Sequence, residues 1–256
     1  MKSSASSILK TDIDRDGTQL IRTLFQRGRQ RLAERFGVTL SVHGDFAAFS
    51  RVDREGWHTF QAYTDEHSHA SRGIALIVTD ATGPIATYAC ALYDAHPDMA
   101  TVIDERGFYD DGTGDRFEIV DPSARQWFEA MRGRVACSGG IWVKPSHRKT
   151  DLSRTLVPLF PLLGRAIAVE CWRAEHVFAL MPQDVVTKQI ASRYRLSFME
   201  PGIEWRHGGE RLPFWFGYHA PLLVTRDAMA FLQREFEVLD PGATGRADQR
   251  VAIPAE

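Results

Sequence analysis

The chain has 256 residues, of which 44% are hydrophobic and 25% are charged, a balance typical of a globular protein. Its formal net charge of −2 argues against a nonspecific nucleic-acid binder, which presents a basic surface. No uninterrupted apolar run approaches the roughly 20 residues of a membrane span, and no apolar core of a secretory signal follows Met1. The three cysteines lie in apolar patterns typical of reduced thiols, so we expect a cytoplasmic protein.

The N-terminal part predicts a polar tail, a helix and a strand. Residues 1–11 are small and polar, which is typical of a disordered tail. Apolar residues recur at helical spacing from Thr18 to Phe36, and Gly37 follows as a C-cap would. The alternating run Val38–Val42 predicts a strand, whereas residues 46–62 show only a rough helical spacing.

A β-hairpin is expected next. Two apolar runs, Gly73–Asp80 and Pro84–Tyr93, are joined by a short turn that contains Gly83. Residues 94–115 are rich in Asp and Gly and have no clear period, so we interpret them as an excursion over the surface. Phe117–Val120 is compatible with a short strand.

Helices and strands then alternate along the chain. Asp121 and the proline after it predict a helix start, and this helix would reach Met131. The segments that follow are a strand at Val135–Val143, a polar loop at Lys144–Thr150, a helix from Asp151 to about Trp172, a strand at His176–Met181 and a helix from Pro182 to Phe198. Pro158 and Pro161 fall inside the long helix, so it is either bent or begins late, near Val157.

The C-terminal part predicts two strands and a helix. Ile203–Trp205 and Phe214–Val224 would pair around turn residues at His207–Gly209. Thr225 would start a helix that ends near Phe236, and the tail from Pro241 is polar.

These elements predict one α/β (α+β) domain. We expect a central mixed, mostly antiparallel sheet with helices on both faces and extra helices at the N- and C-terminal ends. The domain would span residues 12–238, with a core at about 72–224, between the disordered tail at 1–11 and a loose tail at 239–256.

Other clusters of reactive side chains have simpler interpretations, and we expect no metal. Asp12–Gly17 matches the opening of an EF-hand loop, but Thr23 stands where the twelfth ligand, a Glu, is required. No group of His and Cys has zinc-like spacing. Cys90, Cys137 and Cys171 each lie in an apolar pattern, which predicts reduced core thiols.

The strand, basic loop and helix between Val135 and Trp172 predict an anion site. A helix N-terminus presents unpaired N–H groups and a partial positive charge, and both suit a phosphate. Backbone N–H groups of residues 149–153 would bind a diphosphate, with Arg148 and Lys149 adding charge. The alternative is a plain helix start with Asp151 as N-cap, whose charge would repel a diphosphate.

The order of elements resembles the acyl-CoA-dependent N-acyltransferases of the GNAT superfamily. In that family, a loop of pattern Gln/Arg-x-x-Gly-x-Gly/Ala holds the CoA pyrophosphate. The matching run here is Arg148–Ser153, in which Asp151 and Ser153 replace the two small residues. Ala191–Phe198 is similar to the family's Ala-x-x-x-Tyr helix ending near Gly-Phe, but it is one residue shorter and has Ser197 for the Gly.

The resemblance implies transfer of an acyl group, most often acetyl, from acyl-CoA to an amine by direct attack. Gly139 and Gly140 would mark a bulge where the strand splays from its neighbour and binds the pantetheine arm. The implied CoA contacts are Ile141, Trp142 and Val143 for the pantetheine and Arg148, Lys149, Thr150, Asp151, Leu152 and Ser153 for the pyrophosphate.

The resemblance also implies a general acid, Tyr194, which would protonate the CoA thiolate. Its alternative role is that of an amphipathic side chain packing at a helix end. For the general base we expect Glu118, and the other candidates are Asp121, Glu170 and His176, or a chain of waters.

Two functional alternatives remain open from the sequence. One is a binding or regulatory module with the same fold and a decayed site, and the other is an acyltransferase that uses a long-chain or carrier-protein donor. The expected partner is a small-molecule amine, and an exposed strand edge of this fold would also allow a homodimer.

Overall fold

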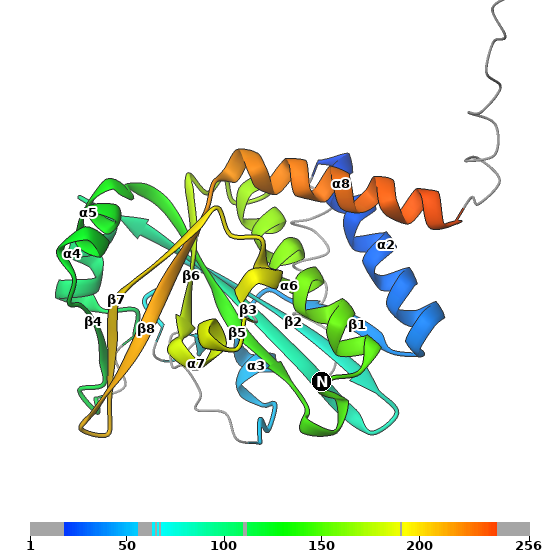
Figure 1. The fold of residues 1–256 in the computed structure, drawn as a ribbon, viewed down its shortest axis with the longest axis horizontal. Coiled ribbons are helices and arrows are strands. Elements are labelled where there is room, and N and C mark those ends of the chain that lie inside the picture. The colour runs from blue at the N-terminus through cyan, green and yellow to red at the C-terminus, as the bar shows by residue number, and fades with distance from the viewer. Residues whose placement is uncertain are drawn as a thin grey trace, which may run out of the picture.

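The computed structural model describes residues 18–55, 63–64, 66, 68–109, 112–189 and 191–239 (Figure 1). Three predicted segments lie outside these residues. They are the disordered tail at 1–11, the segment at 12–17 that matches an EF-hand opening, and the C-terminal tail at 239–256 except for its first residue.

One sheet of eight strands forms the centre of the protein, in the order β1-β2-β3-β5-β6-β8-β7-β4. Within the described part of the chain, β5 and β6 form its one parallel pair of neighbours, which confirms the predicted mostly antiparallel sheet. The strands are β1 (Thr39–His43), β2 (Arg72–Asp80), β3 (Gly83–Ala95), β4 (Arg116–Ile119), β5 (Gly133–Val143), β6 (His176–Pro182), β7 (Phe198–His207) and β8 (Glu210–His219).

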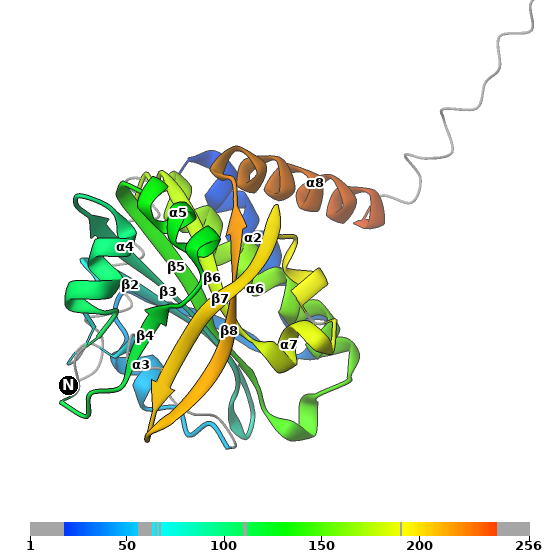
Figure 2. The ribbon, with the colours of Figure 1, turned by 60° about the vertical axis from the view of Figure 1, so that its left-hand side comes forward.

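Helices cover both faces of this sheet, as predicted. The α-helices are α2 (Gln19–Phe36), α3 (Ala47–Ser50), α4 (Met99–Thr101), α5 (Pro122–Ala130), α6 (Asp151–Glu170), α7 (Gln183–Thr187) and α8 (Pro221–Leu239). The terminal helices α2 and α8 pack with α6 on one face, and Figures 1 and 2 show α3, α4 and α5 lying away from them.

Two apolar cores, one on each face, explain why the central strands are continuous hydrophobic runs. All residues of β3 from Ile85 to Tyr93 are buried. Alternate side chains of a strand point to opposite faces, so Tyr88 packs with the α6 core and Tyr93 with the α5 core. A strand covered on both faces needs apolar residues at every position.

The predicted surface excursion at 94–115 is wrong for its first half. Residues 99–106 form α4 and one π-helical turn, and Met99, Ile103 and Phe108 are buried in the α5 core. The helical turns are too short to establish a visible hydrophobic period, so the sequence pattern gives no sign of them.

The predicted helix from Pro182 to Phe198 is also wrong, because the structure breaks it. α7 ends at Thr187, and a separate 3₁₀ turn follows at Ala191–Tyr194. Gln189 has φ 57°, a left-handed conformation that ends a helix. Likewise, β8 ends at His219 rather than Val224, since Pro221 already begins α8.

α6 is continuous from Asp151 to Glu170 despite Pro158 and Pro161, so the late start near Val157 is excluded. Its N-cap is Thr150, not Asp151: the Thr150 hydroxyl accepts a hydrogen bond from the Ser153 amide at 3.3 Å. By length and a mean hydropathy of 1.3 it could cross a membrane, but 78% of that window is buried inside the protein, as in the core helix of a globular domain.

Candidate active site

The parallel strands β5 and β6 pair over only four residues and then diverge. Val135–Ser138 pairs with His176–Ala179, and no further pairs follow. Beyond this point β5 still pairs with β3, and β6 still pairs with β8, through backbone hydrogen bonds. The facing edges therefore present backbone N–H and C=O groups that have no strand partner.

A bulge at Gly139–Gly140 shapes the start of this open edge, as predicted. Gly140 has φ 62°, and the Thr87 hydroxyl donates to its carbonyl at 3.2 Å. A Cβ on Gly139 would lie 2.6 Å from the Tyr63 hydroxyl, and one on Gly140 would lie 2.8 Å from the Phe49 ring. Both positions therefore require glycine, because neighbouring aromatic side chains occupy the space.

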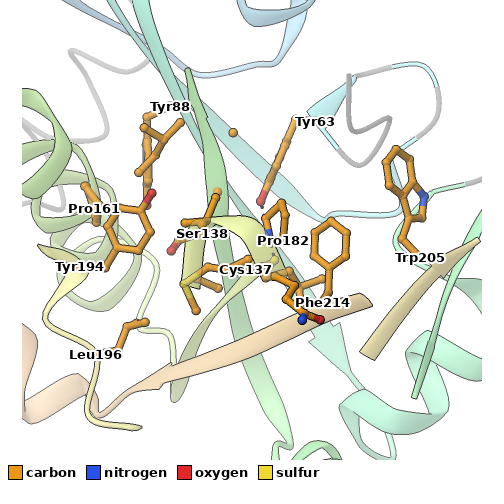
Figure 3. A pocket seen from close by; sticks show the side chains of 18 of the residues that line it. Tyr63, Tyr88, Cys137, Ser138, Pro161, Pro182, Tyr194, Leu196, Trp205 and Phe214 are labelled. Carbon is orange, nitrogen blue, oxygen red and sulfur yellow. Dashed lines mark hydrogen bonds between the residues drawn. The ribbon is translucent and has the colours of Figure 1, made fainter. Parts of the chain in front are cut away.

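A cavity of about 530 Å³ lies at the divergence, lined by Cys137–Ile141 of β5 and Ala179–Pro182 of β6. Figure 3 shows Tyr88, Pro161 and Tyr194 on one side of Ser138, and Tyr63, Phe214 and Trp205 on the other. Tyr88 belongs to the α6 core, whereas Tyr63 and Phe214 belong to the α5 core. The cavity therefore passes through the sheet and could receive two substrates from opposite faces, and its size suits a small-molecule site.

Tyr194, the general acid that the resemblance implies, is one of the residues that line this cavity. It ends the 3₁₀ turn at Ala191–Tyr194 and is half-buried. Burial raises the pKa of Tyr194 to about 12, against a smaller opposing effect of Arg193. Its hydroxyl is therefore protonated at neutral pH and can donate a proton.

Glu118, the expected general base, does not line the cavity. It lies on the edge strand β4, where its carboxylate is 2.8 Å from Arg116 Nη2 and 2.7 Å from Arg206 Nε. These two ion pairs assign Glu118 a place in the pairing of β4 with β7.

The other base candidates also have structural partners and do not line the cavity. Asp121 caps α5 at the Ser123 amide, Glu170 accepts a hydrogen bond from Thr225, and His176 lies 3.4 Å from the Tyr218 hydroxyl. The described carboxylate that does line the cavity is Asp184 of α7, whose exposed side chain pairs with Lys188 at 2.9 Å. Sequence reasoning missed Asp184, which stands at a helix start where an acidic residue is ordinary.

The predicted pantetheine contacts are divided between the cavity and its surroundings. Ile141 lines the cavity. Trp142 is buried, and its indole N–H donates to the Glu55 carbonyl at 3.4 Å. The Val143 carbonyl already accepts a hydrogen bond from Arg148 Nε of the following loop, at 2.9 Å.

The predicted diphosphate loop, residues 148–153, lies at the start of α6 and outside the cavity lining. The amides of Asp151 and Leu152 have no hydrogen-bond acceptor among the described residues, as expected for a first helical turn. The Asp151 carboxylate lies 3.1 Å from Arg154 and 3.7 Å from Arg35, so cations offset its charge. Lys149, the residue before the N-cap, adds another cation to this helix start.

A buried polar cluster lies where β8 ends and α8 follows. His219 at the end of β8 is 2% exposed, and its Nε2 lies 3.8 Å from the carboxylate of Asp227 on α8. Burial lowers the pKa of His219 to about 4, helped by Arg165 and opposed by Asp227. His219 is therefore neutral in the folded protein at neutral pH.

We expect this histidine to weaken the fold in acid. Its pKa rises from about 4 in the folded state to about 6.5 in the unfolded state, so only the unfolded state is protonated between these values. Stability should fall by up to about 3 kcal/mol as the pH drops through this window. Urea titrations at pH 7 and pH 4.5 should show a smaller fall for His219→Gln than for His69→Asn, an exposed control. An equal fall in both variants would contradict the assignment.

No group of three or more His, Cys, Asp or Glu side chains within the described ranges is placed to hold a metal ion. The three cysteines are free and buried, which confirms them as core thiols. Cys137 lines the cavity, but burial raises the pKa of its thiol to about 12, so it is protonated and a poor nucleophile.

No family model matches this sequence, and no curated protein matches it. The fold is similar to several solved structures. A chimera of the spermidine N-acetyltransferase SpeG from Vibrio cholerae and hSSAT has 9% identity and a TM-score of 0.39, covering 72% of this chain and 98% of its own. An N-acetyltransferase from Staphylococcus aureus Mu50 has 8% identity and a TM-score of 0.39, with coverages of 72% and 99%.

NAA60 from Arabidopsis thaliana in complex with acetyl-CoA has 10% identity and a TM-score of 0.39, covering 71% of this chain and 99% of its own. At such values the similarity transfers no residue role and no substrate to this chain.

Proposed function

We propose that this protein is an acyltransferase that moves an acyl group from an acyl-CoA to an amine by direct attack. The observation that carries the proposal is the cavity at the divergence of β5 and β6, whose lining includes both an open strand edge and a protonated tyrosine. Acetyl is the simplest donor, and a cavity of about 530 Å³ also has room for a longer acyl chain.

Each part of the donor has a matching group in the chain. The amide groups of pantetheine would hydrogen-bond to the open edge of β5, as a peptide adds to a sheet. The phosphates would accept hydrogen bonds from the amides that begin α6, with Lys149 and Arg154 adding charge.

The reaction needs one bond formed, one broken and two proton transfers. The neutral amine nitrogen attacks the thioester carbonyl carbon, and the carbon–sulfur bond breaks. The leaving thiolate takes the proton of Tyr194, and the new ammonium loses its proton to water or to Asp184, the carboxylate of the lining. The amide and CoA then leave, and solvent returns a proton to Tyr194.

Thermal shift with acetyl-CoA, longer acyl-CoAs and free CoA tests the proposal. A ligand at about 100 times its Kd stabilises the folded state by roughly 2.7 kcal/mol. For a domain of this size we therefore expect the melting temperature to rise by roughly 5–11 °C. Pantetheine is the control, because it lacks the diphosphate and should give a much smaller shift. No shift with any thioester near millimolar concentration would contradict the proposal.

A binding module without catalysis is the second candidate, favoured by the absence of the four predicted base residues from the cavity lining. Turnover separates the two candidates. The binding module would be favoured if acyl-CoA bound saturably but no product formed with any of a broad panel of amines. The same panel should also give no product when a carrier protein donates the acyl group.

A further inference from the structure

We infer that the α6 side of the cavity binds a carboxylate group carried by one of the two substrates, either the acyl chain or the amine acceptor. This inference rests on the proposed function and names a feature of the substrate that the function alone does not require. It follows from a buried arginine and a buried tyrosine hydroxyl that border the same space.

Arg165 is the first of these groups. It lies on α6, is 2% exposed and lines the cavity. Its Nε–H donates to the carbonyl of Pro161 at 2.9 Å, and no described carboxylate forms an ion pair with it. The acid that acts on it electrostatically, Asp227, already lies 3.8 Å from His219 and 3.5 Å from Arg226. The two terminal nitrogens of Arg165 therefore remain available to a ligand.

Tyr88 is the second group. It is fully buried and lines the cavity, and its hydroxyl has no hydrogen-bond partner within 3.5 Å among the described residues. The hydroxyl of Ser138 interacts with it more weakly. The pKa of Tyr88 is raised well above its usual value, mainly by burial, while Ser138 and Arg165 act in the opposite direction. A Cβ added at Gly164, the neighbour of Arg165 on α6, would lie 2.5 Å from the Tyr88 hydroxyl, so this hydroxyl lies close to α6. Figure 3 shows Tyr88 and Ser138 bordering the same space.

The chemistry of this set points to an anion. Arginine has only donors, and the hydroxyls of Tyr88 and Ser138 can also donate. A buried cation without a counter-ion is costly, and a buried hydroxyl without a partner adds to the cost. A carboxylate has two oxygens that accept paired N–H bonds from a guanidinium and a further bond from a hydroxyl. An unsubstituted alkyl chain offers no acceptor to the terminal nitrogens of Arg165 or to the Tyr88 hydroxyl.

Two arms of one kinetic experiment distinguish the source of the carboxylate. In the first, succinyl-CoA is compared with butyryl-CoA, which has the same chain length and no carboxylate. In the second, amino acids are compared with their amides at a fixed acetyl-CoA concentration. We expect a preference of about 10- to 100-fold for the carboxylate in one arm, since a charge-assisted hydrogen bond contributes in that range. Equal values in both arms would overturn the inference.

Arg165→Met should abolish the preference while leaving acetyl-CoA binding and the melting temperature of the free protein nearly unchanged. The variant loses the hydrogen bond from Nε to the Pro161 carbonyl, but it also removes a buried cation that has no ion pair within 4 Å among the described residues. These two effects oppose each other, so the fold should be retained. If the variant keeps the preference, or loses it together with acetyl-CoA binding, Arg165 does not hold a carboxylate.

Tyr88→Phe provides a test that does not depend on the folding of the arginine variant. It removes a hydroxyl without a protein partner, so the fold should be retained while the preference for the carboxylate falls by about 5- to 10-fold. The matched control is Tyr93→Phe, which removes another buried hydroxyl without a partner, outside the cavity lining. The same effect in both variants, or none in either, would overturn the inference.

Calorimetry with succinate and succinamide, without any CoA, separates this inference from the proposed function. Succinate should bind the wild-type protein more tightly than succinamide and should lose that advantage in Arg165→Met. This result would stand even if no acyl-CoA bound, and its failure would leave acyl transfer from CoA intact.

Discussion

Replacing Tyr194 with phenylalanine is expected to lower kcat for acyl transfer by about 10²- to 10⁴-fold, the range typical of a lost general acid. Acyl-CoA affinity should change little, because the substitution removes one oxygen and leaves the ring that lines the cavity. Steady-state kinetics together with a thermal shift for acetyl-CoA measure the two effects separately.

The pH dependence of the acyl-transfer rate tests the role of Tyr194 in a second way. A general acid works only while protonated, and the pKa of Tyr194 is raised to about 12. Activity should therefore rise as the amine acceptor loses its proton and should show no decline from Tyr194 below about pH 11. Tyr218→Phe is the matched control, since Tyr218 is half-buried on β8 and does not line the cavity. Equal loss of kcat in the two variants, or unchanged kcat in Tyr194→Phe, would contradict this role.

Gly140→Ala should destabilise the protein by roughly 2–5 kcal/mol. About 1–2 kcal/mol comes from placing an L-residue at φ 62°, and about 1–3 kcal/mol comes from overpacking. The added Cβ would lie 2.8 Å from the buried Phe49 ring and 3.3 Å from Ala89 Cβ. A melting temperature lower by roughly 5–20 °C would follow.

Gly37→Ala isolates the packing contribution. Gly37 ends α2 at φ 65°, nearly the angle of Gly140, but an added Cβ there would meet no atom within 4 Å. This control should lose only the conformational cost, about 1–2 kcal/mol. If chemical denaturation shows the same loss for both variants, Phe49 does not restrict the bulge.

The sheet could be predicted because its signals are local. The apolar runs of β2 and β3 and the turn at Gly83 predict a hairpin, and the cap at Gly37 predicts the end of α2. The break after α7 could not be predicted in this way. It depends on the left-handed conformation of Gln189. Glycine or asparagine at this position would have indicated such a conformation, whereas glutamine does not.

Of the residues that line the cavity, a sequence motif singles out some, whereas only packing brings the others there. Tyr194 and the bulge at Gly140 follow from the family resemblance and from glycine chemistry. Arg165 could not be recognised in advance, because one arginine in an apolar helical pattern is also compatible with a surface position. Only the contact between α6 and β3 reveals that it lies beside Tyr88.

The short ladder between β5 and β6 divides the sheet into two leaves, β1-β2-β3-β5 and β6-β8-β7-β4, which meet through four residue pairs. α6 crosses this seam, because it contacts β3 and β5 on one side and β6 on the other. A substrate bonded to the open edge of β5 would extend the ladder across this seam. Such a substrate would add to the four residue pairs that hold the two leaves together, so we expect its binding to stiffen the sheet at this seam.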